Sequence, residues 1–121
     1  MKRVAITGAG TVNALGLDVP ATLAAFQEGR LGITALDFRD VDRLGVRIGG
    51  QVHGWDPEAH FNRQQIALYD RVTQFTMVAA KQAIDQSGID TRGKLGLDAG
   101  VVLGTAGGGV NTWDENYRAV Y

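Results

Sequence analysis

Residues 3–16 read RVAITGAGTVNALG, and the order of residue types in this stretch favours an α/β fold. The apolar, β-branched run at residues 4–7 is typical of a buried strand, and Gly8 and Gly10 after it suit a tight turn. A dinucleotide-binding fingerprint would need a third glycine where this chain has Asn13. A structural turn is therefore the favoured interpretation, with a short nucleotide-binding α/β module as an alternative.

Helices are predicted from the signals that begin and end them. Asp18 is a suitable N-cap, Pro20 follows in the first turn, and Gly29 can end that helix in the left-handed conformation. A second, short helix is expected to begin at DPE, residues 56–58. The longest helix is expected over residues 70–88, with a wide apolar face that predicts cover on most sides and includes Val72, Phe75, Ala79 and Ala83.

Two further strands and a last helix complete the predicted order βαβααβα. Residues 46–53, VRIGGQVH, alternate as a half-exposed strand does, and residues 99–103 form a continuous apolar strand typical of a parallel sheet. The glycine loop GTAGGG follows at residues 104–109, and Asn111 or Thr112 is expected to cap the last helix. Because a strand buried on both faces needs neighbours, we expect an incomplete, mostly parallel sheet that belongs to a larger α/β domain.

Composition narrows the class of protein. The chain has 121 residues, 45% of them hydrophobic, and a net charge of −1, which argues against a nucleic-acid or anionic-membrane partner. No apolar run approaches the roughly 20 residues of a membrane span, so a cytoplasmic protein is predicted. The absence of cysteine excludes disulfides, thiolate metal ligands and a cysteine nucleophile within this chain.

Other catalytic or binding motifs are weak. Residues 104–109 lack the G-K-[ST] ending of a phosphate-binding loop. His53 and His60 are separated by a segment with Asp56 and Glu58, but surface histidines are favoured over a metal site. No nucleophile elbow is present, and no metal or cofactor is predicted.

Four motifs in series carry a resemblance to a known family: RVAITGAGTVNALG at residues 3–16, GRLGIT at 29–34, DRVTQFTMVAAKQAIDQSGID at 70–90, and GVVLGTAGGG at 100–109 with a downstream ENY. Together they resemble the N-terminal part of the β-ketoacyl-acyl-carrier-protein synthases, the elongating condensing enzymes of fatty-acid synthesis and their polyketide and nodulation-factor relatives. The resemblance implies that residues 1–121 are one partial domain, with no internal boundary, from the N-terminal half of a layered αβαβα thiolase-like fold.

The chemistry that this resemblance implies is an acyl transfer followed by decarboxylative condensation with a malonyl thioester. It implies acyl carrier protein, with malonyl and acyl thioesters, as partners, a homodimer, and no cofactor. The family's catalytic cysteine and two histidines would follow Tyr121, so no catalytic residue is expected in this chain. The segment alone is expected to be inactive, and His53 and His60 do not occupy the catalytic positions.

Three residues are carried over from the family by position. Gly107 aligns with a position that gates the acyl-chain pocket, beside the dimer partner. Arg63 and Arg71 remain from a basic segment that docks carrier protein in other members. Because few other cations are kept there, a catalytically silent homologue resembling a chain-length factor stays open, as does a truncated paralogue that pairs with a complete synthase.

Overall fold

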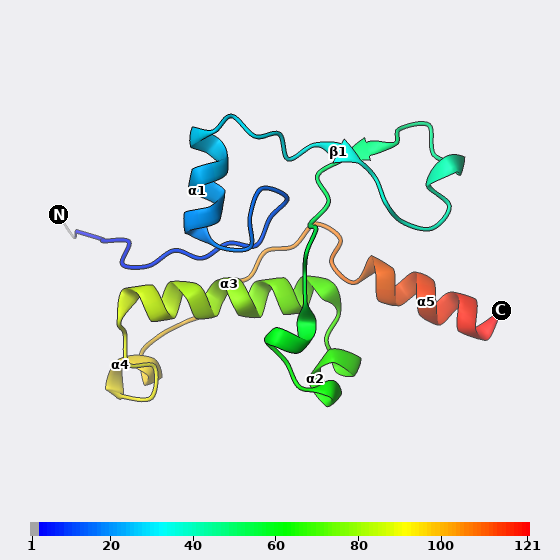
Figure 1. The fold of residues 1–121 in the computed structure, drawn as a ribbon. Helices are drawn as coiled ribbons and strands as arrows, with labels where there is room; N and C mark the ends of the chain where they lie inside the picture. The colour runs from blue at the N-terminus through cyan, green and yellow to red at the C-terminus, as the bar shows by residue number, and fades with distance from the viewer. Residues whose placement is uncertain (1–2) are drawn as a thin grey trace.

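Helix α3 (Arg71–Ser87) is the longest element of the computed structural model, which describes residues 3–121. In Figure 1 the N-terminal segment and α1 lie on one side of α3 and α2 lies on the other, while α4 lies near its C-terminal end and α5 extends beyond its N-terminal end. The bounds of these helices are α1 Val19–Gln27, α2 Arg63–Leu68, α4 Lys94–Leu97 and α5 Val110–Val120.

The helix predicted after Asp18 and the helix predicted over residues 70–88 are confirmed as α1 and α3. The Asp18 carboxylate accepts a hydrogen bond from the Ala21 amide at 2.7 Å and begins α1. Past its end, Gly29 has φ +66°, in the left-handed region. Asp70 and Gly88 serve α3 in the same way, since Asp70 accepts from the Val72 amide at 2.9 Å and Gly88 has φ +66°.

The short helix predicted at DPE is also confirmed, as the 3-10 helix Pro57–Ala59. The Asp56 side chain accepts from the Glu58 amide at 3.0 Å. Helix α2, which the sequence patterns did not indicate, follows at once. Its capping box pairs the side chains of Asn62 and Gln65 with each other's backbone amides.

The prediction of a mostly parallel sheet is not met among the described residues. Strands β1 (Thr34–Ala35) and β2 (Ile48–Gly49) form an antiparallel pair, with Thr34 opposite Gly49 and Ala35 opposite Ile48. The strand expected over residues 46–53 is thus confined to two residues, and β1 lies in a segment for which no strand was predicted.

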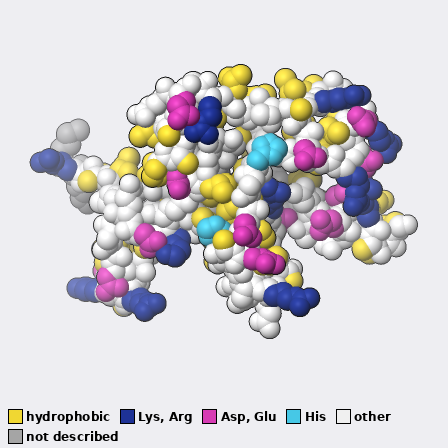
Figure 2. Space-filling model, in the orientation of Figure 1, with side chains coloured by type: hydrophobic (Ala, Val, Ile, Leu, Met, Phe, Trp, Pro, Cys, Tyr) yellow, Lys and Arg dark blue, Asp and Glu magenta, His cyan; other side chains and the backbone are white. Residues whose placement is uncertain are grey.

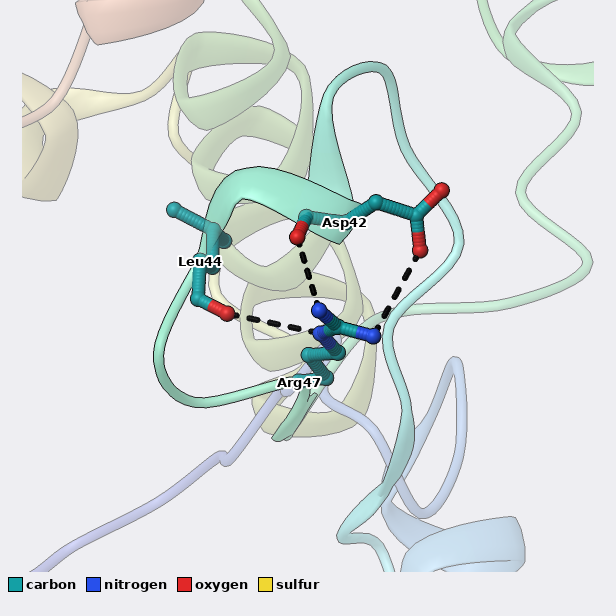
Figure 3. Close-up of polar contacts among 3 residues, drawn as sticks. All are labelled: Asp42, Leu44 and Arg47. Carbon is teal, nitrogen blue, oxygen red and sulfur yellow. Dashed lines mark hydrogen bonds and ion pairs between the residues drawn. The ribbon is translucent and has the colours of Figure 1, made fainter.

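Arg47 closes the loop that joins β1 to β2 (Figure 3). Its guanidinium donates to the carbonyl oxygens of Asp42, at 2.7 Å, and Leu44, at 3.4 Å, and lies 3.6 Å from the Asp42 carboxylate. Asp42 belongs to the 3-10 helix Val41–Arg43. One side chain therefore satisfies backbone carbonyls that the short hairpin leaves without ladder partners.

Residues 4–7 and 99–103, predicted as buried strands, have no regular secondary structure here. Their side chains are exposed: Val4 95%, Ile6 93%, Val101 95% and Val102 99%. A strand is defined by ladder bonds to a neighbour about 4.8 Å away, and neither segment has such a neighbour in the described chain. The β-type pattern is present, but the pairing that would make it a strand is not.

The tight turn predicted at Gly8 and Gly10 is not formed: the TGAG segment, residues 7–10, runs without a turn along α3. A Cβ atom placed on Gly8 would lie 2.0 Å from the Ala83 carbonyl oxygen, and one on Gly10 would lie 1.9 Å from that of Ala79. Two α3 side chains hold the segment in place: Gln86 accepts from the Ala9 amide at 2.6 Å, and Gln82 from the Thr11 amide at 3.0 Å. The glycines are therefore required for close approach to a helix.

Asn13, which stands where the dinucleotide fingerprint needs a glycine, fixes the turn that the described chain forms at residues 13–16. Its side-chain oxygen accepts from the amides of Leu15, at 2.8 Å, and Gly16, at 3.2 Å. Its nitrogen donates to the Thr11 and Thr22 hydroxyls, at 2.9 and 3.0 Å. Because Thr22 lies in α1, Asn13 ties this turn to the helix that follows it.

The chain leaves much of its apolar surface open. Its accessible surface is 10079 Å² at 12.9 kDa, whereas a compact monomer of that mass would expose about 6,300 Å². Among the described hydrophobic residues only Ala25 and Val78 are buried, and Val72 and Met77 on α3 stay partly exposed. The rest of the described chain therefore does not bury the wide apolar face of α3 as predicted.

The prediction that Asn111 or Thr112 caps the last helix is wrong. Helix α5 begins at Val110, after Gly109 in the left-handed region with φ +87°. The Thr112 side chain is not free to cap because its hydroxyl donates to the Asp70 carboxylate. A contact distant in sequence thus overrides the local signal.

Candidate functional site

The glycine loop at residues 104–109 meets the N-terminal end of α3 and forms a pocket of about 430 Å³. One wall is the first turns of α3, which contribute the apolar side chains of Val72 and Phe75. The other wall is mainly the backbone of the loop and the start of α5. The lining residues are Asp70, Arg71, Val72, Phe75, Thr105, Ala106, Gly107, Gly108, Gly109, Val110 and Asn111.

Two adjacent glycines of this loop have different roles. Gly107 has φ +144°, which disfavours any side chain, and a Cβ atom there would meet no other atom within 4 Å. A Cβ atom on Gly108 would lie 2.9 Å from Val72 Cγ1 and 2.8 Å from Thr105 Oγ1. Gly108 is thus packed against α3, whereas Gly107 faces open space.

Asp70 connects α3 to α5 beside this pocket. One carboxylate oxygen accepts from the Val72 amide and caps α3, and the other accepts from the amide of Thr112, at 3.4 Å, and from its hydroxyl. The Thr112 hydroxyl first, and then the Val72 amide, lower the pKa of Asp70 below its ordinary value of 3.8. The carboxylate is therefore ionised over the whole neutral range.

This depressed pKa predicts an acid-dependent contribution to stability. A carboxyl group whose pKa is lower in the folded state stabilises the fold above its unfolded pKa, near 3.8, and stops doing so as pH falls through the folded value. Asp70→Asn is therefore expected to lower the free energy of unfolding at pH 7, with the difference from wild type shrinking below pH 3.8. Urea unfolding of both proteins at a series of pH values measures it; a pH-independent difference would contradict the assignment.

The three residues carried over by position lie in different settings. Arg71 and Gly107 line the same pocket. The Arg71 guanidinium donates to the Val52 carbonyl at 2.8 Å and lies 5.2 Å from the centre of the Phe75 ring, so it is held against the chain. Arg63 is exposed at the start of α2 and lies beside Glu58, Phe61 and Ile66 instead.

The two histidines lie apart, as the separate patches of Figure 2 show. His53 Nε2 is 3.4 Å from the Thr34 hydroxyl, whereas the His60 ring stacks on Trp55 with 5.0 Å between ring centres. Trp55 in turn donates to the buried Gln74 side chain at 3.0 Å. Within residues 3–121 no cluster of three or more His, Cys, Asp or Glu side chains could hold a metal ion.

The geometry of the TGAG segment does not support the dinucleotide alternative. The glycine faces that would have to approach a pyrophosphate are occupied by the carbonyl oxygens of Ala79 and Ala83. The next helix begins only at Val19, so its N-terminus does not directly follow the glycines.

None of the described helices is long and apolar enough to cross a membrane.

The described residues form a helix-rich chain with one short antiparallel β-pair and a glycine-lined pocket. Residues 1–120 match the family model for the β-ketoacyl synthase N-terminal domain, and the chain belongs to this family. Membership gives it a thiolase-like α/β fold.

Individual relatives agree with the family match. The chain is 30% identical over 117 residues to 3-oxoacyl-[acyl-carrier-protein] synthase 2 of Staphylococcus aureus strain N315, covering 97% of this chain and 28% of the relative. It is 32% identical over 120 residues to the chloroplastic 3-oxoacyl-[acyl-carrier-protein] synthase I of Arabidopsis thaliana, covering 97% and 25%. Nodulation protein E of Rhizobium sp. strain N33 is 29% identical over 119 residues, covering 98% and 29%. The chain thus spans between a quarter and a third of the length of these relatives.

Proposed function

We propose that this chain forms the N-terminal portion of a 3-oxoacyl-[acyl-carrier-protein] synthase, a cytoplasmic homodimer acting in fatty-acid or polyketide synthesis. The observation that carries the proposal is the family match over residues 1–120, together with synthases that are about 30% identical along nearly the whole chain. The open surface of the chain supports a longer polypeptide, because 10079 Å² is far more than a finished domain of this mass exposes.

In the longer polypeptide the fold is completed as a layered αβαβα structure, of which residues 1–121 are one partial domain. Residues 4–7 and 99–103 then become strands of a mostly parallel sheet. Their apolar, β-branched side chains, now almost fully exposed, support this placement because such side chains stabilise a fold when both faces of a sheet cover them.

The pocket at the glycine loop is the proposed entrance for the acyl chain. Gly107 supports this role because its side-chain position faces open space, and Val72 and Phe75 supply an apolar wall opposite. An alkyl chain gains about 0.8 kcal/mol for each methylene buried against such a wall. Gly107 is therefore proposed to leave room for a long acyl group.

The reaction needs a cysteine that this chain does not contain. An acyl group moves from a carrier-protein thioester to that cysteine, and malonyl thioester then loses CO₂ to give a carbanion. The carbanion attacks the acyl carbon, the cysteine thiolate leaves and takes up a proton, and the product is a 3-oxoacyl thioester. Residues 1–121 contribute the pocket, and the remainder of the polypeptide contributes the catalytic groups.

Carrier-protein docking is proposed for Arg63 and, less directly, for Arg71. Arg63 is exposed at the start of α2, where a cation can attract an acidic partner. Arg71 is bonded to the Val52 carbonyl, so an acidic partner would have to compete with that bond. This restraint favours weak docking and keeps a catalytically silent homologue as the second candidate.

The test compares the proposed full-length synthase with residues 1–121 alone. Both are incubated with acyl and malonyl carrier proteins that carry a label in the malonyl carboxyl group. The full-length protein is expected to release CO₂ and 3-oxoacyl product in equal amounts, and residues 1–121 to release neither. A full-length protein that releases no CO₂, and that co-purifies with a complete synthase subunit, would establish the silent homologue instead.

A further inference from the structure

The Asp70 carboxylate, which lines the pocket, joins helices α3 and α5. Asp70 precedes α3 and Thr112 lies in the first turn of α5, 42 residues later in the chain. The Thr112 amide and hydroxyl both point at one oxygen of Asp70, while the other oxygen caps α3. Hydrogen bonds to a charged acceptor are about twice as strong as neutral ones, which makes this the strongest polar link that the described residues show between α3 and α5.

The glycine loop lies between these two anchor points. Residues 104–109 lead directly into α5, so fixing Thr112 fixes the end of the loop. Within the loop the Gly108 amide donates to Thr105 Oγ1 at 3.1 Å, and a Cβ atom on Gly108 would lie 2.9 Å from Val72 Cγ1, so the loop contacts α3 at Gly108. The position of Gly107, whose Cβ position meets no atom within 4 Å, then depends on the link between Asp70 and Thr112, which holds the start of α5.

We propose that Asp70 and Thr112 are positioning residues that fix the glycine loop in its observed position, with Gly108 against Val72 and Gly107 clear of α3, and thereby keep the pocket long enough for extended acyl chains. This inference rests on the proposed synthase function. With the link broken, the start of α5 is no longer held at the N-terminal end of α3, and the loop around Gly107 is free to close onto Phe75, since covering apolar surface is favourable. Closure shortens the pocket, so long acyl chains lose more than short ones.

Thr112→Val is the variant that separates positioning from helix capping. It removes the hydroxyl with little change in shape and leaves the cap on α3 untouched. Thr112→Ser keeps a hydroxyl and serves as the rescue variant. Thr76→Val is the matched control, because the Thr76 hydroxyl donates at 2.8 Å to a carbonyl within the same helix, that of Val72.

Two readouts are taken on the full-length protein. The first is kcat/KM for a dodecanoyl thioester relative to a butyryl thioester, and Thr112→Val is expected to lower this ratio about tenfold. The second is hydrogen exchange of the amides at residues 105–112, which is expected to become about tenfold faster in the same variant. Thr112→Ser and Thr76→Val are expected to match wild type in both.

The two readouts keep this inference separate from the proposed function. If wild type condenses both thioesters but Thr112→Val changes neither the ratio nor the exchange, the positioning role is wrong. If exchange rises while the ratio stays constant, the link holds the loop but does not select acyl length. A wild-type protein with no condensing activity overturns the proposed function and acyl selection together, and the exchange data then decide the positioning role alone.

Discussion

Replacing Gly10 with alanine is expected to destabilise the full-length protein by about 3 kcal/mol, the upper range for overpacking a close contact. The new Cβ atom would lie 1.9 Å from the Ala79 carbonyl oxygen and 2.9 Å from Gln82 Cβ. Both neighbours belong to the middle of α3, where neither can move aside without displacing the helix. The TGAG segment must therefore move away from α3, which breaks the bond from the Thr11 amide to Gln82.

Gly45→Ala is the matched control for this prediction. It introduces the same methyl group at a glycine whose Cβ position meets no atom within 4 Å and whose backbone does not require glycine. Its effect is expected to stay within about 0.5 kcal/mol, as for other surface substitutions. Urea unfolding followed by tryptophan fluorescence compares the two variants, and equal stabilities would show that the TGAG segment is not packed on α3.

Sequence patterns predicted the ends of the helices well because capping is local chemistry. The carboxylates of Asp18, Asp56 and Asp70 each bond an amide two or three residues further on, and the residues that do this are known from type and spacing alone. Gly29 and Gly88 end their helices for an equally local reason, since both adopt positive φ.

The sheet could not be predicted from the same patterns because pairing is not local. Residues 99–103 have the composition of a buried strand, yet a strand forms only where a second segment supplies ladder bonds. Within the described chain that pairing is made instead by Thr34–Ala35 with Ile48–Gly49, which have weaker β-type sequences. Periodicity reports which side chains favour burial and not which segment will cover them.

In the candidate site, too, local features were predictable from sequence and contacts between distant residues were not. The glycine loop was predictable from sequence, because glycine clusters mark turns and close approaches, whereas Gly107 was singled out within it by the resemblance to the synthase family. The bond between Asp70 and Thr112 was not predictable, because it joins residues 42 apart and uses a threonine that has the sequence position of a helix cap. The Gln82 and Gln86 contacts with the TGAG segment were missed similarly, since glutamines on a helix usually face water.

Gly107→Ile is expected to reduce kcat/KM for long acyl thioesters by about 10- to 100-fold, the range that a few methylene groups confer in an apolar pocket. The side chain would extend from a position with no atom within 4 Å into the space between the loop and Phe75. Short acyl thioesters do not reach as far and are expected to lose much less. The product distribution therefore shifts toward shorter chains, which mass spectrometry of the released acyl groups measures.

Backbone strain is the competing explanation, and Gly107→Ala isolates it. At φ +144° any side chain is unfavourable, so alanine already introduces strain in the loop while adding only one methyl group to the pocket. If strain dominates, alanine and isoleucine reduce activity on short and long thioesters alike. If pocket volume dominates, alanine still lowers both rates together through strain, whereas isoleucine also lowers the ratio of the long-chain rate to the short-chain rate. Only isoleucine occupies the space that a long acyl chain needs.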